Sequence, residues 1–564
     1  MLGWAARWRS RMAGNAQPGI RARATSNGRC RVIRSSTRRL LGLWMGAATL
    51  LLLGACASLP TDYPRQPSQA IVDTHDTRLG REIGSLTAEH PGKSGFYPLA
   101  SGIDAFVARL AVVQAADRGL DVQYYIWHND TAGRILLEAL LQAGDRGVRV
   151  RLLLDDLDTA GKDLGIRFVD AHPNIEVRLF NPFASRGNRG IDFLTDLQRV
   201  NRRMHNKSLT ADNQATIVGG RNVGNEYFGG VSAAAFADLD VLAVGPVVNE
   251  VSVSFDTYWN SSWAVPISAF EGEPIPTKAD LAASRKALSD DIERARTTPY
   301  AEALRKSFLA HEEDLSELGF SLGRALLLYD APSKAAGTDA SGSSRMGPKL
   351  KMAFDAAQTE LLIISPYFVP GDWLVDYLGQ LVHQGVKVRI LTNSIAANDV
   401  GVVHAGYMRY RHALLKRGVE LYEFKSTGEE LANDDGGRRW SGSSKASLHA
   451  KTFGIDRRAL FVGSFNLDPR SAHLNTEMGV LFESPELATQ LGEEFDSELD
   501  TKAYRLELVT VSAAESRSGF EEHALHWVTR ENGKERCYTV EPETHLWQRF
   551  MVKLLSPFVI ESFL

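Results

Sequence analysis

Cysteine is scarce in this chain, and its scarcity excludes a scaffold built on disulfides. Only Cys30, Cys56 and Cys537 occur among 564 residues, whereas disulfide frameworks use four or more cysteines. Close cysteine pairs and histidines four residues apart, which are typical of zinc sites, are missing too. We therefore expect Cys537 to be an ordinary thiol, and we expect no metal ion or other cofactor.

Acidic residues and lysine are absent from the first 55 positions, which contain ten arginines. Without these ten, the remaining 54 basic residues face 68 acidic ones, so the rest of the chain has a net charge of −14. Non-specific affinity for nucleic acid comes from Lys and Arg that neutralise phosphates. An acidic body therefore disfavours nucleic acid as a partner.

Long hydrophobic runs are missing as well. The apolar stretch Leu40–Leu53 is shorter than the roughly 20 residues that span a bilayer as a helix. It follows Arg38-Arg39 and ends in Leu-Gly-Ala-Cys56, which is typical of a secretory signal and resembles a bacterial lipobox. We expect a signal peptide over 1–55 and a lipid on Cys56. The lipid would anchor the protein on the periplasmic side of a bacterial cell envelope. An uncleaved anchor is the alternative, and the choice between inner and outer membrane stays open.

An α/β pattern is present, and it occurs twice. The segments Gly147–Arg151 and Gly385–Arg389 are nearly identical, and each reads as a strand after a helix. This repeat predicts a duplicated α/β domain, with one copy over 91–330 and the other over 331–510. We expect 57–90 to be a tether and 511–564 to be a C-terminal extension packed on the body.

Two polar stretches are predicted to be loops. Residues 331–347 are rich in Ala, Gly and Ser, and residues 426–446 are rich in Gly and Ser. The second loop stands just before the second motif described below. It is either a cover for that site or a plain surface insertion.

One motif recurs at a constant offset of 244 residues. It reads His-x-Lys, an Asp five positions after the Lys, and then Gly-x-x-Asn. Its spacing is the same in both copies, so a chance match is excluded. The two copies comprise His205, Lys207, Asp212, Gly219 and Asn222, and His449, Lys451, Asp456, Gly463 and Asn466.

These residue types at this spacing suit phosphodiester chemistry. His and Lys two positions apart on a strand point to the same face, and the following turn brings Asn beside them. In two facing copies, the lysines and asparagines hold the phosphate oxygens and the developing charge. One imidazole attacks phosphorus, and the other protonates the leaving oxygen. Histidine fits both tasks because its unperturbed pKa is about 6.5.

Each histidine also needs a group that holds its other ring nitrogen. A carboxylate follows each motif, and we assign Asp240 and Glu477 to this task. The motif aspartates Asp212 and Asp456 belong to the site set, but we expect them to act structurally, by bonding the motif's own turn.

At these residues the sequence resembles the phospholipase D superfamily, whose hallmark is a duplicated His-x-Lys-Asp motif. The resemblance covers about 90–510. It implies two α/β sandwich domains around a pseudo-twofold axis, an active site between them, and metal-independent catalysis through phosphohistidine. By the same resemblance, His205 is the nucleophile and His449 the general acid.

Finer features resemble bacterial cardiolipin synthases of the C type: Ser365–Pro370, His404–Tyr407 and Gly463–Ser471. The resemblance implies a phosphatidyltransferase at a membrane surface, with phosphatidylglycerol and possibly phosphatidylethanolamine as substrates. The first copy has Gly220 where the second has Ser464, so we expect a hydroxyl contact to phosphate on one side only.

Three other functions remain open at this point. A phospholipase D-type hydrolase that releases phosphatidic acid would use the same catalytic residues. A nuclease is disfavoured by the acidic body. A catalytically dead lipid-binding scaffold is disfavoured because both motif copies are complete.

Overall fold

The computed structural model describes residues 58–229, 236–270, 276–310, 315–337, 342, 345–398, 400–426, 447–511 and 522–555. All of them belong to one compact unit, Ser58–Leu564. The expected signal peptide and lipobox, with Cys56, lie outside the described residues. So do most of the expected loop at 426–446 and parts of the loop at 331–347.

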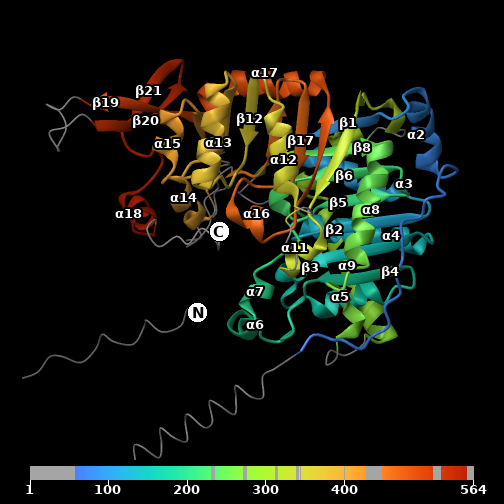
Figure 1. Cartoon of the computed structure of the whole chain (residues 1–564). Helices are drawn as coiled ribbons and strands as arrows, with labels where there is room; N and C mark the ends of the chain where they lie inside the picture. Colours follow the sequence, from blue (N-terminus) through green and yellow to red (C-terminus); the bar gives the residue numbers. More distant parts are fainter. Residues whose placement is uncertain are drawn as a thin grey trace, which may run out of the picture. The chain divides into compact units, whose positions relative to one another are not determined.

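Within the described residues, the first half is built on a nine-stranded mixed sheet (Figure 1). Strands with alternating or continuous apolar residues form its centre, where both faces are covered. In spatial order the strands are β10 (Ser321–Gly323), β1 (Ser94–Leu99), β8 (Asp240–Val244), β6 (Ala215–Gly219), β5 (Ser208–Ala211), β2 (Gly119–Tyr124), β3 (Arg149–Asp155), β4 (Ile175–Phe180) and β9 (Ala264–Pro266).

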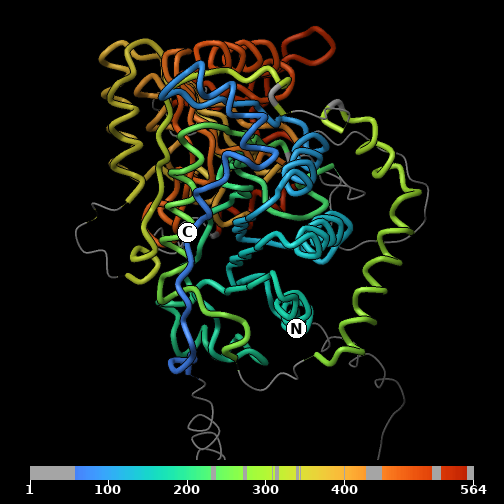
Figure 2. The backbone as a smooth tube through the Cα atoms, turned by 90° about the vertical axis from the view of Figure 1, so that its right-hand side faces the viewer, coloured from blue at the N-terminus to red at the C-terminus, as the bar shows by residue number. Residues whose placement is uncertain are grey.

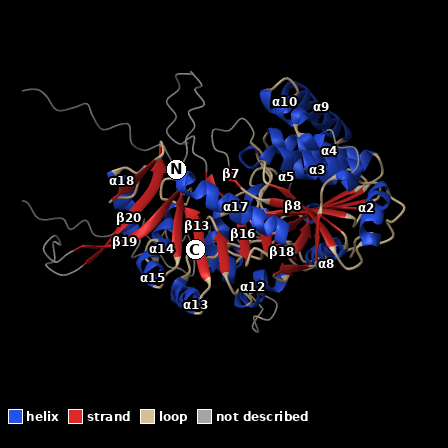
Figure 3. Cartoon of the chain, turned by 90° about the horizontal axis from the view of Figure 1, so that it is seen from above, coloured by secondary structure: helices blue, strands red, loops and turns tan. Residues whose placement is uncertain are grey.

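Helices cover both faces of this sheet. Alternate residues of each strand point to opposite faces: Leu152 joins the core under α3, α4 and α5, whereas Leu153 packs with α8. Figure 3 shows α3, α4 and α5 on one side of the first sheet and α8 on the other. These helices are α3 (Gly102–Ala115), α4 (Thr131–Asp145), α5 (Asp163–Asp170) and α8 (Pro246–Trp259).

The second half repeats this sheet. Eight neighbouring strands of the second sheet, from β11 to β19 in spatial order, match the eight strands from β1 to β9 in the spatial order of the first sheet. Their relative directions are also the same, which confirms the predicted duplication. In spatial order the strands are β11 (Ala325–Tyr329), β18 (Met478–Glu483), β17 (Ala459–Gly463), β16 (Lys451–Ile455), β12 (Glu360–Ile364), β13 (Lys387–Asn393), β14 (Glu420–Phe424), β19 (Ala503–Val511), β20 (Glu522–Glu531) and β21 (Lys534–Tyr538).

The two halves share an apolar core. Phe96 and Val218 of the first sheet pack in one cluster with Val462 and Val480 of the second. The rings of Phe96 and Phe482 stack with their centroids 4.0 Å apart. Burial of apolar surface therefore fixes one sheet against the other.

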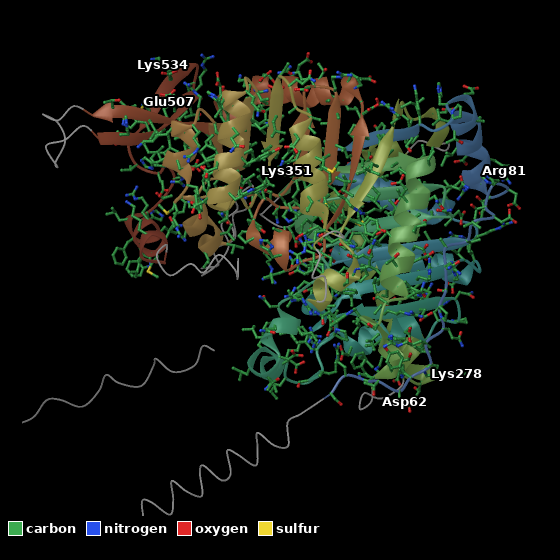
Figure 4. All side chains as sticks on the ribbon, in the orientation of Figure 1. Asp62, Arg81, Lys278, Lys351, Glu507 and Lys534 are labelled. Atoms are coloured by element: carbon green, nitrogen blue, oxygen red, sulfur yellow. The ribbon has the colours of Figure 1, made fainter. Side chains whose placement is uncertain are left out.

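Some boundaries differ from the sequence-based expectation. The change between sheets falls at Arg324, because β11 already pairs with β18. The segment 57–90 is not a free tether. It contains α2 (Arg78–Glu89), whose labelled Arg81 points outward in Figure 4, and its Ser68 carbonyl accepts a hydrogen bond from the buried Arg151 (2.8 Å).

The C-terminal segment joins the second half directly. Its strands β20 and β21 extend the second sheet beyond β19. The last described helix, α18 (Leu546–Leu555), contacts α14 (Gly401–Tyr407). No described helix has the length and apolar composition that crossing a membrane requires.

Candidate active site

The first motif copy is held by a backbone bridge between the halves. Met204 pairs with Thr476, and the His205 N–H donates to the Thr476 carbonyl (2.8 Å). His205 and Lys207 stand just before β5, both largely buried. This places the first histidine at the junction with the second half.

The second motif copy is held by an equivalent backbone contact with the first half. The two-residue strands β7 (Phe236–Ala237) and β15 (Ser447–Leu448) pair in parallel. The His449 N–H then donates to the Ala237 carbonyl (2.8 Å). Each histidine is thus positioned by backbone from the opposite half, as a pseudo-twofold relation between the halves requires.

The carboxylates cross between the halves as well. Nδ1 of His205 lies 2.8 Å from Oε2 of Glu477, and Nδ1 of His449 lies 2.6 Å from Oδ2 of Asp238. Both carboxylates are fully or almost fully buried. Each histidine is therefore oriented by a side chain from the other half, and neither half alone contains a complete site.

The expected contact of Asp240 with a histidine is wrong, and Asp238 makes it instead. Asp240 accepts from Arg109 (2.8 Å) and from the Arg221 N–H (3.1 Å) in a buried ion pair. The sheet register explains the difference. In the first sheet Asp240 pairs with Gly219, and in the second sheet Gly479 pairs with Gly463, so Asp240 and Gly479 are equivalent positions. The residue that reaches the histidine lies two positions before each of them, at Asp238 and Glu477.

Ser464 and Gly220 also take different places from those expected. The Ser464 hydroxyl donates to the Glu477 carboxylate and accepts from the Met478 N–H (3.1 Å). At Gly220, a Cβ would lie 2.2 Å from the Asp238 carboxylate. Ser464 thus supports an orienting carboxylate rather than a phosphate, and Gly220 leaves room for the other carboxylate.

The motif aspartates lie at the far ends of the motif strands. The five residues from Lys207 to Asp212 span about 17 Å of extended chain. Asp212 accepts three 2.8 Å hydrogen bonds from the backbone N–H groups that lead into β2, at Asp117, Arg118 and Gly119. Asp456 does the same before β12. Both are structural, but they bond a neighbouring strand rather than their own turn.

Comparisons with known proteins agree on the family of this chain. A family model described as "Cardiolipin synthase, PLD-like domain" matches twice, at residues 110–259 and 350–499. The chain belongs to this phospholipase D-like family. It is 44% identical to Cardiolipin synthase C of Escherichia coli (strain K12) over 485 residues, which are 86% of this chain and 99% of the relative.

Two further similarities agree with this membership. An uncharacterized protein of Helicobacter pylori (strain ATCC 700392 / 26695) is 32% identical over 78% of this chain and 87% of its own length. The crystal structure of a phosphatidylserine synthase from Haemophilus influenzae Rd KW20 matches with a TM-score of 0.52 and 13% identity. That match covers 86% of this chain and 100% of the other, and it supports the fold alone.

The two lysines of the phospholipase D-like motif are buried beside the histidines. The ammonium of Lys207 donates to the His205 carbonyl (2.7 Å), and that of Lys451 donates to the His449 carbonyl. Burial, together with the nearby Lys451, lowers the pKa of Lys207 to about 7. A bound phosphate would raise this pKa, because an anion favours the charged ammonium.

The two histidines differ in their electrostatic surroundings. Burial and then the two lysines hold the pKa of His205 well below its usual value. Burial also raises the pKa of its partner Glu477 to about 7. Burial works to raise the pKa of Asp238 too, but the adjacent His449 and Lys451 outweigh it and hold that pKa low. His449 therefore has an ionised partner, whereas the partner of His205 changes its charge near pH 7.

The asparagines and two unpredicted tyrosines complete the surroundings of the site. The Asn222 amide donates to the Tyr227 hydroxyl (3.0 Å), and the buried Oδ1 of Asn466 accepts no hydrogen bond from the described residues. The rings of Tyr125 and Tyr227 pack edge-on against His205 and His449, at centroid distances of 4.9 Å and 5.3 Å. No pattern in the sequence marks these tyrosines.

One group of potential metal ligands occurs among the described residues, and it contains neither motif histidine. It consists of His128, Asp130 and Glu226. Its members already bond within the protein: His128 pairs with Glu226 (3.0 Å), and Asp130 caps α4 through the Gly133 N–H (3.0 Å). The motif site itself is built from imidazoles, ammonium groups and amides.

Proposed function

We propose that this protein is a phosphatidyltransferase that makes cardiolipin through a phosphohistidine intermediate. The observation that carries the proposal is the pair of buried histidines, each bonded through Nδ1 to a carboxylate of the opposite half. The similarity to Cardiolipin synthase C over 86% of this chain supports the choice of substrate class.

In the first step, Nε2 of His205 attacks the phosphorus of a phosphatidylglycerol. The bond from phosphorus to the headgroup oxygen breaks, and His449 donates its proton to that oxygen. The lysines stabilise the charge that develops on the phosphoryl oxygens. The products are a phosphatidyl group on His205 and free glycerol.

In the second step, a hydroxyl of another phospholipid attacks the same phosphorus. His449 accepts the hydroxyl proton, the P–N bond breaks, and cardiolipin forms. The electrostatic difference between the histidines supports this order of roles. A neutral imidazole is required in a nucleophile, and an imidazole next to an ionised carboxylate holds a proton more readily.

A hydrolase of the phospholipase D type is the second candidate, because water can take the place of the lipid alcohol. Labelled phosphatidylglycerol, supplied with and without phosphatidylethanolamine, distinguishes the two after lipid separation. We expect labelled cardiolipin. Phosphatidic acid as the only product would replace the synthase with the hydrolase, and a difference between the two lipid mixtures would identify the donor.

We further propose that the protein is anchored at a membrane by a lipid on Cys56 and that α18 lies against the bilayer. Four apolar side chains of α18 are exposed, among them Leu546 at 79% and Trp547 at 67%, while Arg549 and Lys553 lie on the same helix. A helix with aromatic and aliphatic residues beside basic ones suits an anionic lipid surface.

Two measurements test this placement. Labelling with fatty acid should modify the wild-type protein and spare Cys56→Ala. In the Cys56→Ala background, Trp547→Glu with Phe550→Glu should reduce sedimentation with phosphatidylglycerol vesicles, whereas Trp373→Glu on α13 (Gly371–His383) should not, although Trp373 is 63% exposed. Equal binding by all variants would refute the role of α18.

A further inference from the structure

A cavity of about 420 Å³ lies in the first half next to the catalytic residues. Tyr125 and Asp155 line its end nearest to the site. The Tyr125 ring packs against the ring of His205 and lies 5.5 Å from Nζ of Lys207. Tyr125 therefore belongs both to the lining of the cavity and to the surroundings of the motif residues.

The interior of the cavity is apolar. The sheet contributes side chains of β3 and β4, and the helices α4 and α5 contribute others. Core residues of this kind are normally in contact with other side chains, but here they surround a space that can hold a ligand. The apolar wall includes Leu137, Leu152, Leu154, Ile166, Val169 and Val177.

Two cations of the lining are neutralised by acidic residues that also line the cavity. Arg134 on α4 pairs with Asp291 (2.5 Å), and Lys162 pairs with Asp158 (2.6 Å). Neutralised cations leave little attraction for a phosphate or another anion. The lining thus favours an uncharged apolar ligand.

A helix forms the outer side of the cavity and contributes two small side chains, Ser284 and Ala287, both of which are also exposed. This helix, α9 (Lys278–Ala295), lies as a separate rod outside the other helices of the first half (Figure 2). Its lining residues Ser284, Ala287, Leu288 and Asp291 follow the spacing of one helical face. Larger side chains at Ser284 and Ala287 would occupy part of this space.

We propose that this cavity binds an acyl chain of the phospholipid whose phosphate is attacked by His205. The inference rests on the proposed function and specifies its substrate site. A phospholipid bound with its phosphate between the two histidines must place its acyl chains within a few ångströms of the headgroup. Past Tyr125, the cavity offers one of them an apolar path.

Filling the cavity from α9 tests this proposal. Ala287→Phe places a ring on the face of α9 that lines the cavity, whereas the matched control Ala282→Phe places the same ring on the opposite face. Both alanines are exposed, so the two variants differ in the face that carries the ring. Activity is measured with long-chain phosphatidylglycerol in mixed micelles and with a water-soluble phosphatidylglycerol that has four-carbon chains. Thermal unfolding confirms that each variant is folded, and Ser284→Leu replaces Ala287→Phe if that variant unfolds.

We expect Ala287→Phe to lower kcat/KM for the long-chain lipid by about tenfold or more and to leave kcat/KM for the short-chain lipid unchanged. The control Ala282→Phe should leave both values unchanged. Equal kcat/KM values for the long-chain lipid in both variants would overturn the proposal, and so would an equal loss on both substrates. If the wild-type protein acts on neither lipid, the proposed function itself fails, which is a different result.

Discussion

The two motif histidines are chemically alike but have different partners. His205 is bonded to Glu477, whose pKa burial raises to about 7, and His449 to Asp238, whose pKa its cationic neighbours hold low against burial. Burial and Lys451 lower the pKa of His449 too, but the adjacent Asp238 opposes them. These differences support the proposed roles of His205 as the nucleophile and His449 as the acid. The assignment predicts that the two alanine variants respond differently to the leaving group.

His449→Ala should lower kcat/KM for phosphatidylglycerol by about 10²–10⁴-fold, because the alkoxide then leaves without a proton. The loss should be much smaller for a p-nitrophenyl phosphodiester, whose leaving group needs no protonation. His205→Ala should abolish turnover of both substrates, since it removes the attacking nitrogen. The opposite pattern of substrate dependence would exchange the two roles.

Asp238 and Asp240 provide a matched pair of carboxylates two residues apart. Asp238→Asn should lower kcat by roughly 10²–10⁴-fold while the protein stays folded, because the amide no longer holds the tautomer of His449 that catalysis needs. Asp240→Asn leaves the buried Arg109 without its anion and should cost about 3–5 kcal/mol of unfolding free energy. Steady-state kinetics and chemical denaturation measure both effects. Similar kinetic and stability profiles in the two variants would contradict the site geometry.

The pH dependence follows from Lys207. Its ammonium must be charged to hold the phosphate, and in the empty site its pKa is about 7 because of burial. The charged form is therefore lost as pH rises through about 7, so kcat/KM, which reports the free enzyme, should fall above that pH. The value of kcat should fall only at higher pH. A kcat/KM that stays constant up to pH 9 would refute this role of Lys207.

Most of the site residues could be predicted at this scale, because a constant offset of 244 is visible in the sequence alone. The expectation for Asp240 is wrong because the motif alone does not show which of the following carboxylates faces the histidine. That depends on the register of the sheet. Aligning Val241-Leu242 with Val480-Leu481 would have identified Asp238 as the counterpart of Glu477. Tyr125 and Tyr227 were beyond prediction, since only the fold brings their rings to the histidines.

At the scale of elements, the motif strand links catalysis to stability. One end of the strand β5 follows His205 and Lys207, and the other end leads to Asp212, which holds the backbone before β2. Asp212 also has a φ of 50°, a conformation that Asp tolerates better than most residues. The role of this aspartate in the motif is therefore to stabilise the sheet.

Asp212→Ala should lower the unfolding free energy by about 3 kcal/mol, because it removes a buried carboxylate that accepts three backbone hydrogen bonds. Asp212→Asn should lose less, since one acceptor oxygen remains. Denaturant unfolding gives the stability, and kcat per folded molecule should stay near the wild-type value in both. Normal stability combined with lost catalysis would show that Asp212 acts in the chemistry.

The repeated elements could be predicted because their patterns recur. The nearly identical segments Gly147–Arg151 and Gly385–Arg389 lead into β3 and β13. The segment 57–90 could not be predicted, because it is polar. Its order comes from contacts distant in sequence, such as the bond from Arg151 to Ser68. The strand β11 was also missed, since its partner β18 lies about 150 residues further along the chain.

In the whole molecule, the main feature is that each half supplies the groups that position the catalytic histidine of the other half. Backbone and carboxylate from each half position the histidine of the other, at Thr476 and Glu477 on one side and at Ala237 and Asp238 on the other. The shared core around Phe96 keeps these contacts in register. This arrangement suits the proposed mechanism, in which a covalent intermediate forms on one half and a residue of the other half helps to resolve it.

Trapping the proposed intermediate is the most direct test of the mechanism. His449→Ala, mixed with a phosphatidyl p-nitrophenol, should form a phosphatidyl group that accumulates, because the base for the second step is absent. Mass spectrometry of the intact protein and of its peptides should then find one phosphatidyl group on His205, and none in the protein that also has His205→Ala. A phosphatidyl group on any other residue, or an adduct that persists without His205, would exclude His205 as the nucleophile.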